Sequence, residues 1–429
     1  MANAKIFCNT PWYEAHIYWD GSLGICCQES RRLSLDSKFN IRNMSLTEWF
    51  NSEPVRQLRQ AVLSDLPTDI CSQCYLEESV SNTSRRHRSN QKSVIFTKTA
   101  FQNSFEQSPG RRHFTADGLS TTLPIDLHID LGNYCNLACK MCWSGASTRI
   151  ATQYVKWGYE DHRQYLGNDW TKDTNVWNKF LDELLTIPKL KNIHFMGGET
   201  LLTTRLEEFV DFMILHKRFD ICFSFVTNGT TFNESLISKL KHFARVGIEV
   251  SIETITKHND YVRQGTNTND VLKNIQRYKQ HCNNSTISVT LRPAINALTI
   301  GYYHTLLEYC LENQFLIKSL IVANPKYLDP GVLPAAVRNK YKENYQKLLI
   351  ELDDSVTDTE FNESDPHNYR RSIKLQVEQI LALLDCTVPQ QEELLKEMIS
   401  TCKKWDNELN FNALELYPEL TTEFKAHGY

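Results

Sequence analysis

The chain has 429 residues, a net charge of −4 and 41% hydrophobic residues, enough for two or three domains or for one barrel with an attached part. A charge this close to neutral gives no general case for binding nucleic acid or a membrane surface. No run approaches the about 18 apolar residues of a membrane span, and the first residues lack the basic flank and apolar stretch of a signal peptide. We therefore expect a cytoplasmic protein.

The N-terminal part, residues 1–78, is rich in cysteine. Without an export signal, metal ligation explains these thiols better than disulfides do. Residues 16–19 with the turn Asp20-Gly21 predict a hairpin, and Ser45 with Glu48 predicts the start of a helix over 45–63. The cysteines of this part are Cys8, Cys26, Cys27, Cys71 and Cys74.

Residues 79–122 are polar and show no periodic pattern, which predicts a connecting segment. They include a basic run, 85–88. Such a run is most often a solvated face, and a contact with a substrate or partner is the alternative.

From residue 123 onward, strand and helix patterns alternate, which predicts an α/β fold with a parallel sheet. Six strand–helix units are too few for a complete eight-stranded barrel, so we expect an open, TIM-like partial (β/α)6 barrel over 123–330, with its chemistry at the carboxyl ends of the strands. Residues 331–429 predict a helical extension. The predicted strands are 125–131, 192–196, 221–226, 248–252, 286–291 and 316–322; the predicted helices are 175–186, 206–216, 233–243, 268–281 and 301–313, then 337–352 and 373–384 in the extension.

Cys135, Cys139 and Cys142 follow the first predicted barrel strand with the spacing Cys-x3-Cys-x2-Cys. Zinc usually takes four ligands from paired Cys-x2-Cys groups, which this loop does not offer. Three thiolates on one loop instead predict an iron–sulfur cluster in which one iron has no protein ligand. A zinc site or plain thiols are the alternatives. An iron left open in this way can bind a small molecule and act on it.

This loop resembles the cysteine loop of the radical S-adenosylmethionine (SAM) enzymes. The resemblance implies a [4Fe–4S] cluster whose open iron is chelated by the amino and carboxylate groups of SAM. It also implies reductive cleavage of SAM to a 5′-deoxyadenosyl radical that takes a hydrogen atom from the substrate. That family often has an aromatic residue just before the third cysteine. Here Met141 stands there and Trp143 follows the cysteine, so both are expected neighbours of the adenine.

The second predicted barrel strand ends in Gly197, Gly198 and Glu199. Glycines lack a Cβ and so let the backbone approach a ligand closely. The family resemblance implies that carbonyls of this segment capture the SAM ammonium group. The family form usually ends in proline, where this chain has Thr200.

Further candidate SAM contacts follow later strands. Thr227 ends the third strand, where a simple turn is the alternative. Ser251 and Glu253 end the fourth, where the family often has a polar pair. Arg263 matches an arginine that would pair with the SAM carboxylate, and a surface ion pair is the alternative. Asn296, after the fifth strand, could line the same pocket, although asparagines at strand ends are common turn residues.

A second metal site is predicted in residues 1–78, where a hairpin with Cys26 and a Cys-x2-Cys pair give thiolate ligands. On spacing alone, zinc and an iron–sulfur cluster are comparable explanations. The pattern resembles the SPASM and twitch auxiliary-cluster domains, which usually follow the barrel instead of preceding it. The resemblance implies an auxiliary [4Fe–4S] cluster held by Cys8, Cys26, Cys71 and Cys74, with Cys27 as a substitute for Cys26.

Together these features predict a radical SAM enzyme with an auxiliary-cluster domain over 1–78, a linker over 79–122, the barrel over 123–330 and the extension over 331–429. The resemblance implies a peptide or protein side chain as substrate, with a sugar, nucleoside or amino-acid derivative as the alternative. It also implies an electron donor such as a flavodoxin or ferredoxin. A zinc-binding scaffold protein is the alternative from another class, although it would not need Glu199, Glu253 or Arg263.

Overall fold

The computed structural model describes residues 6–29, 37–81, 84–90, 117–120, 123–322, 324–353, 368–409 and 411–429. The chain divides into two compact units. Unit 1 comprises 1–134, 151–225 and 239–246, and unit 2 comprises 135–150, 226–238 and 247–429. None of the helices in these described ranges is long and apolar enough to cross a membrane.

The strands of unit 1 follow the order β2-β1-β3-β5-β6. All neighbours pair in parallel except β1 and β2, which form the predicted hairpin. The predicted strand 192–196 is confirmed to the residue, and the neighbouring predicted strands are confirmed to within a residue or two. The strands are β1 Glu14–Ile17, β2 Leu23–Gly24, β3 Asp126–Asp130, β5 Asn192–Met196 and β6 Cys222–Thr227.

Strands β3, β5 and β6 alternate between fully buried and half-buried residues. The buried face is apolar and packs on α8, where Phe195 and Phe223 both contact Phe209 edge-to-face. The helices with residues in unit 1 are α1 Leu46–Phe50, α2 Glu53–Leu63, α3 Ser72–Ser81, α6 Thr148–Lys156, α7 Thr174–Leu185, α8 Arg205–Leu215 and α9 Glu234–Leu240.

Two predictions for the N-terminal part need correction. The helix expected over 45–63 is two helices, because the chain breaks at Asn51 and Ser52 before Pro54 restarts it at the first turn of α2. Its predicted start is confirmed, since Ser45 and Glu48 form a complete capping box. In addition, β1 pairs in parallel with β3, so this short strand also extends the parallel sheet.

In unit 2 the sheet order is β7-β9-β11. The strand predicted over 316–322 is in fact two dipeptide strands, and the second, β12, pairs with β10 instead of with β9. A third ladder joins β4 to β8 in antiparallel fashion. The strands are β4 Ala138–Cys139, β7 Arg245–Val250, β8 Arg263–Gln264, β9 Ile287–Leu291, β10 Ala294–Ile295, β11 Leu316–Ile317 and β12 Leu320–Ile321.

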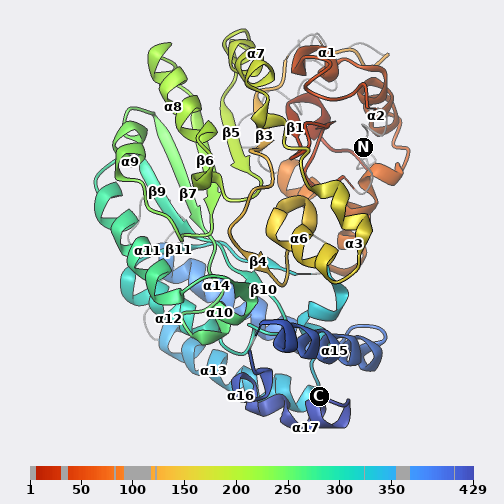
Figure 1. Ribbon diagram of the computed structural model, residues 1–429, viewed down its shortest axis with the longest axis vertical. Helices are drawn as coiled ribbons and strands as arrows, with labels where there is room; N and C mark the ends of the chain where they lie inside the picture. The colour runs from red at the N-terminus through yellow and green to blue at the C-terminus, as the bar shows by residue number, and fades with distance from the viewer. Residues whose placement is uncertain are drawn as a thin grey trace. The chain divides into compact units, whose positions relative to one another are not determined.

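The helices of unit 2 include the predicted extension, drawn in blue in Figure 1. Together with the parallel strand pairings, these helices confirm the predicted α/β fold with helices at the C-terminal end. Their bounds are α10 Lys257–Val262, α11 Thr268–Cys282, α12 Tyr303–Asn313, α13 Ala335–Asp353, α14 Asn368–Asp385, α15 Gln391–Leu409, α16 Ala413–Leu416 and α17 Thr421–Ala426.

The packing of α8 on the sheet yields a stability prediction. Phe195→Ala should lower the free energy of unfolding of the apoprotein by about 3–5 kcal/mol, because it leaves a cavity beneath Phe209 and Phe223. Leu215→Ala on the same helix layer is the control: this side chain is 75% exposed, and the change should be below about 0.5 kcal/mol. Urea titration measures both. Equal effects would contradict this account of the core.

Candidate metal and SAM site

The cysteine loop is held by backbone pairing within unit 2. Cys139 lies directly opposite Arg263 in the β4–β8 ladder, and the Lys140 N–H donates to the Val262 carbonyl at 2.8 Å. No local sequence pattern predicts this ladder, since each strand has only two residues. It fixes the middle of the loop against the segment that carries the candidate arginine.

The other two thiols of this loop act electrostatically on Cys139. Burial raises the pKa of Cys139, and the charges of Cys142 and Cys135 raise it further, whereas the Arg263 guanidinium lowers it. Burial likewise raises the pKa of Cys142. Half-buried thiolates that share one short loop need positive charge nearby to stay ionised. Iron supplies such charge to thiolate ligands, so the donor set fits an iron–sulfur cluster.

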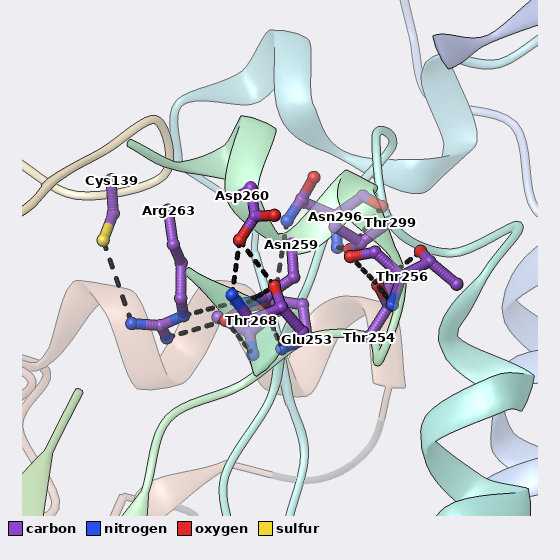
Figure 2. Close-up of polar contacts among 11 residues, drawn as sticks. Cys139, Glu253, Thr254, Thr256, Asn259, Asp260, Arg263, Thr268, Asn296 and Thr299 are labelled. Atoms are coloured by element: carbon purple, nitrogen blue, oxygen red, sulfur yellow. Dashed lines mark hydrogen bonds and ion pairs between the residues drawn. The ribbon is translucent and has the colours of Figure 1, made fainter. Parts of the chain in front are cut away.

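Arg263 forms a buried, two-pronged ion pair with Glu253 (Figure 2). Its Nε donates to Glu253 Oε2 at 2.5 Å and its Nη2 donates to Oε1 at 2.7 Å, while Nη1 lies 3.8 Å from Cys139 Sγ. Burial disfavours the charged guanidinium, but the charges of Glu253 and Cys139 together with the hydrogen bond to Glu253 outweigh this and leave the pKa of Arg263 raised. The pair therefore holds a permanent cation beside a candidate cluster ligand.

A polar network fixes the turn that carries this pair (Figure 2). The Glu253 N–H donates to Asn259 Oδ1 at 2.9 Å, and Asn259 Nδ2 donates to Thr268 Oγ1 at 3.0 Å. The Asp260 carboxylate accepts from the Thr268 N–H at 2.7 Å. Glu253 also accepts from the Ala294 N–H at 3.2 Å. Sequence reasoning missed Asn259 and Asp260, although both flank the predicted arginine.

The segment after β6 reaches the cysteine loop through Asn228, which the sequence analysis also missed. Asn228 Nδ2 donates to Asn136 Oδ1 at 2.8 Å and lies 4.0 Å from Cys135 Sγ. The predicted Thr227 shapes this turn, because its hydroxyl accepts from the Gly229 N–H at 3.2 Å and its carbonyl accepts from the Ser251 N–H at 2.8 Å. Thr227 and Ser251 are thus neighbours in the structure.

Other candidates lie apart from these contacts. Asn296 caps its own turn: its Oδ1 accepts from the Leu298 N–H at 3.0 Å and its Nδ2 donates to the Ala294 carbonyl at 3.0 Å. Trp143 is 52% exposed, and Met141 is half-buried. Their predicted contacts with adenine remain predictions.

In unit 1, the glycines after β5 permit a close approach to the strand that leads into the cysteine loop. A Cβ on Gly198 would lie 2.0 Å from the Tyr134 carbonyl oxygen, and one on Gly197, where φ is +118°, would lie 2.4 Å from the Gly132 oxygen. The Glu199 N–H donates to the Tyr134 carbonyl at 2.8 Å. The structure therefore shows the glycines making room for the chain's own backbone.

The N-terminal thiols fall into two groups in the structure. Burial raises the pKa of Cys8 to about 11, and the neighbouring Cys71 and Cys74 contribute to that shift. Cys26 and Cys27 instead influence each other: a hydrogen bond with Cys27 and burial together raise the pKa of Cys26. Within the described ranges, no three or more His, Cys, Asp or Glu side chains form a group able to hold a single metal ion.

The basic run is not the solvated face that its composition predicted. Residues 85–90 are helical. Arg85 Nη2 donates to both Glu14 carboxylate oxygens at 2.6 and 2.7 Å, and its Nε donates to Cys26 Sγ at 3.3 Å. Arg86 pairs with Glu78 and donates to the Phe7 carbonyl at 3.0 Å. These contacts lie within the chain, so the alternative, a contact with a substrate or partner, stays a prediction.

One face of the sheet carries a row of histidines that sequence reasoning missed: His16 is buried, and His128 and His194 are half-buried. His16, His128 and His194 are in register on β1, β3 and β5, with ring centroids 5.8 and 5.1 Å apart. His194 Nδ1 lies 2.7 Å from Ser224 Oγ on the next strand. The available signal was the alternation of polar and apolar residues along these strands.

Comparison with known proteins agrees with the cysteine patterns. Residues 129–301 match the model of the radical SAM superfamily, and residues 8–75 match the SPASM model, described as an iron–sulfur cluster-binding domain. No match was found among curated proteins.

Solved structures show a distant likeness. The structure of anSMEcpe with bound AdoMet and a Cp18Cys peptide has a TM-score of 0.38 and 15% identity, covering 53% of this chain and 61% of that one. Streptococcus suis SuiB bound to the precursor peptide SuiA has a TM-score of 0.36 and 13% identity, covering 68% and 63%. The chain thus spans about three fifths of each of these proteins.

The buried ion pair yields a prediction for the apoprotein. Arg263→Met should lower the free energy of unfolding by about 3–5 kcal/mol, because it leaves the Glu253 carboxylate buried without its cation. Arg218→Met, whose partner Asp220 is exposed to water, should cost less than about 1 kcal/mol. Chemical denaturation distinguishes the two. A loss at Arg263 no larger than that at Arg218 would show that the pair is not desolvated.

Proposed function

Because the chain belongs to the radical SAM superfamily and carries a SPASM domain, we propose that Cys135, Cys139 and Cys142 hold a [4Fe–4S] cluster that binds SAM. When bound there, a reduced cluster would supply the electron for reductive cleavage of SAM to a 5′-deoxyadenosyl radical. This radical would abstract a hydrogen atom from a substrate. The observation that carries this proposal is the occurrence of three half-buried thiols on one loop whose middle member, Cys139, lies beside the Arg263–Glu253 pair.

The chain's own residues have separate tasks in this proposal. Arg263 offsets the negative charge that gathers on the thiols, because its guanidinium lies 3.8 Å from Cys139 Sγ. Glu253 orients that guanidinium and is itself held by Asn259. Arg263 already donates to both carboxylate oxygens of Glu253. We therefore assign the contact with the SAM carboxylate to Ser251 and Thr227 as well as to Arg263.

We propose that Cys8, Cys71 and Cys74 are ligands of an auxiliary [4Fe–4S] cluster, with Cys26 as the fourth. The match of residues 8–75 to the SPASM model and the mutual influence of the first three thiols support this set. Arg85 donates to Cys26 Sγ at 3.3 Å, which would stabilise a thiolate at that position. Cys27 is the alternative fourth ligand.

We propose a peptide or protein side chain as the substrate, and a small polar molecule as the alternative. The pairing of a SPASM domain with a radical SAM domain is the basis for the first. A flavodoxin or ferredoxin is the proposed electron donor.

Cys139→Ala should abolish release of 5′-deoxyadenosine from SAM in anaerobically reconstituted, reduced protein, because it removes one of only three cluster ligands. Cys222→Ala, at a half-buried thiol outside both ligand sets, is the matched control and should keep wild-type cleavage. Chromatography of the reaction mixture measures the product. Cleavage retained in the Cys139 variant would rule out this loop as the site.

Cys71→Ala should lower the iron content from about eight to about four per chain, since only the auxiliary cluster is lost. Comparing Cys26→Ala with Cys27→Ala then identifies the fourth ligand, because only the true ligand should reproduce that loss. Iron analysis with visible absorption measures each variant. Unchanged iron in the Cys71 variant would remove the N-terminal thiols from the ligand set.

A further inference from the structure

Lys140, between Cys139 and Met141 in the cysteine loop, has its ammonium group enclosed by aromatic rings. Its Nζ lies 3.7 Å from the ring centroid of Tyr261, 4.4 Å from that of Trp405 and 5.5 Å from that of Phe411. The residue is 6% exposed, and among the described residues Nζ has no hydrogen-bond acceptor. We call these three rings the aromatic cage.

Two of the three rings come from the C-terminal extension. Trp405 lies in α15 and Phe411 follows it, and both are outside the residues that match the radical SAM and SPASM models. Tyr261 lies in α10, contacts Phe411 edge-to-face at 5.4 Å, and donates from its hydroxyl to Asp406 at 2.9 Å. The cage is therefore a fixed structure assembled from distant parts of unit 2.

A buried ammonium without a hydrogen-bond acceptor is costly. Aromatic faces offset part of that cost because their negative electrostatic potential attracts a cation. An apolar side chain of similar length would fill the space without this attraction. The aromatic cage thus binds the side-chain cation of Lys140. The backbone of Lys140 is held separately by its hydrogen bond to Val262.

The extension also holds the helix that leads into Arg263. In α10, His258 Nε2 lies 2.8 Å from the Leu416 carbonyl oxygen. The His258 ring stacks on Tyr302 with centroids 3.3 Å apart, and the Tyr302 hydroxyl donates to Glu419 at 2.9 Å. The C-terminal extension therefore contacts both the cysteine loop and α10, the helix that leads into Arg263.

We propose that Lys140 is a positioning residue, which anchors the cysteine loop to the C-terminal extension through the aromatic cage. The anchor fixes Cys139 and Cys142 in place before any iron is loaded. The consequence for cluster assembly rests on the proposed function, whereas the anchor itself is a property of the apoprotein. The two can therefore fail separately.

The test measures the rates at which iodoacetamide alkylates Cys139 and Cys142 in the intact, iron-free protein, by peptide mass spectrometry. Lys140→Ala should accelerate both rates about tenfold, because the loop opens locally more often. Removing a nearby cation without loosening the loop would instead slow alkylation, since fewer thiols would be ionised. Acceleration therefore reports loosening and not lost charge.

Variants separate the cation from the bulk of the side chain. Lys140→Arg should restore slow alkylation, because a guanidinium also binds aromatic faces, whereas Lys140→Met should not. Trp405→Leu should accelerate alkylation, and Trp405→Phe should do so less. Lys257→Ala, at an exposed lysine of α10, is the matched control, and Cys8 is the internal reference.

Unchanged or slower alkylation in Lys140→Ala, or equal protection in Lys140→Met and Lys140→Arg, would overturn the proposal. If Lys140→Ala does not fold, the comparison of Lys140→Met with Lys140→Arg decides the question. Iron loading of the same proteins is then measured separately. A wild-type protein that shows the protection but binds no iron would refute the proposed function and leave the anchor standing.

Discussion

The site depends on one electrostatic constraint: three half-buried thiols lie on one short loop, and burial and the charges of the other two raise the pKa of Cys139. To keep these thiols ionised, the loop needs positive charge. The chain supplies part of it through Arg263, whose own burial is stabilised by Glu253. The iron of a cluster would supply the rest. The buried Arg263 cation and an iron without a protein ligand would therefore both lie at this loop.

Local patterns predicted the elements around this site well. The alternation of apolar and polar residues placed β5 at 192–196, and the capping box at Ser45 and Glu48 is present as expected. The same patterns failed where a feature depended on a distant partner. Strand β1 joins β3 more than a hundred residues away, and the two dipeptide strands at 316–321 belong to different ladders.

The residues of the site show the same division. Spacing alone identified the three cysteines, and a glycine pair at a strand end predicted a close approach. The partner in that approach is the chain's own carbonyl at Tyr134, which no local pattern encodes. Arg263 and Cys139 are 124 residues apart, and the cage around Lys140 draws on residues near 405, so neither contact could be read from sequence spacing. Contacts between residues that lie far apart in the sequence could be identified only from the structure.

The central claim is that these three thiols leave one iron free for SAM. Pulsed electron–nuclear double resonance on the reduced protein, with SAM labelled with ¹⁵N in its amino group, tests this most directly. The account predicts a ¹⁵N coupling to the cluster in wild-type protein. A fully reduced cluster that binds SAM but shows no such coupling would contradict it.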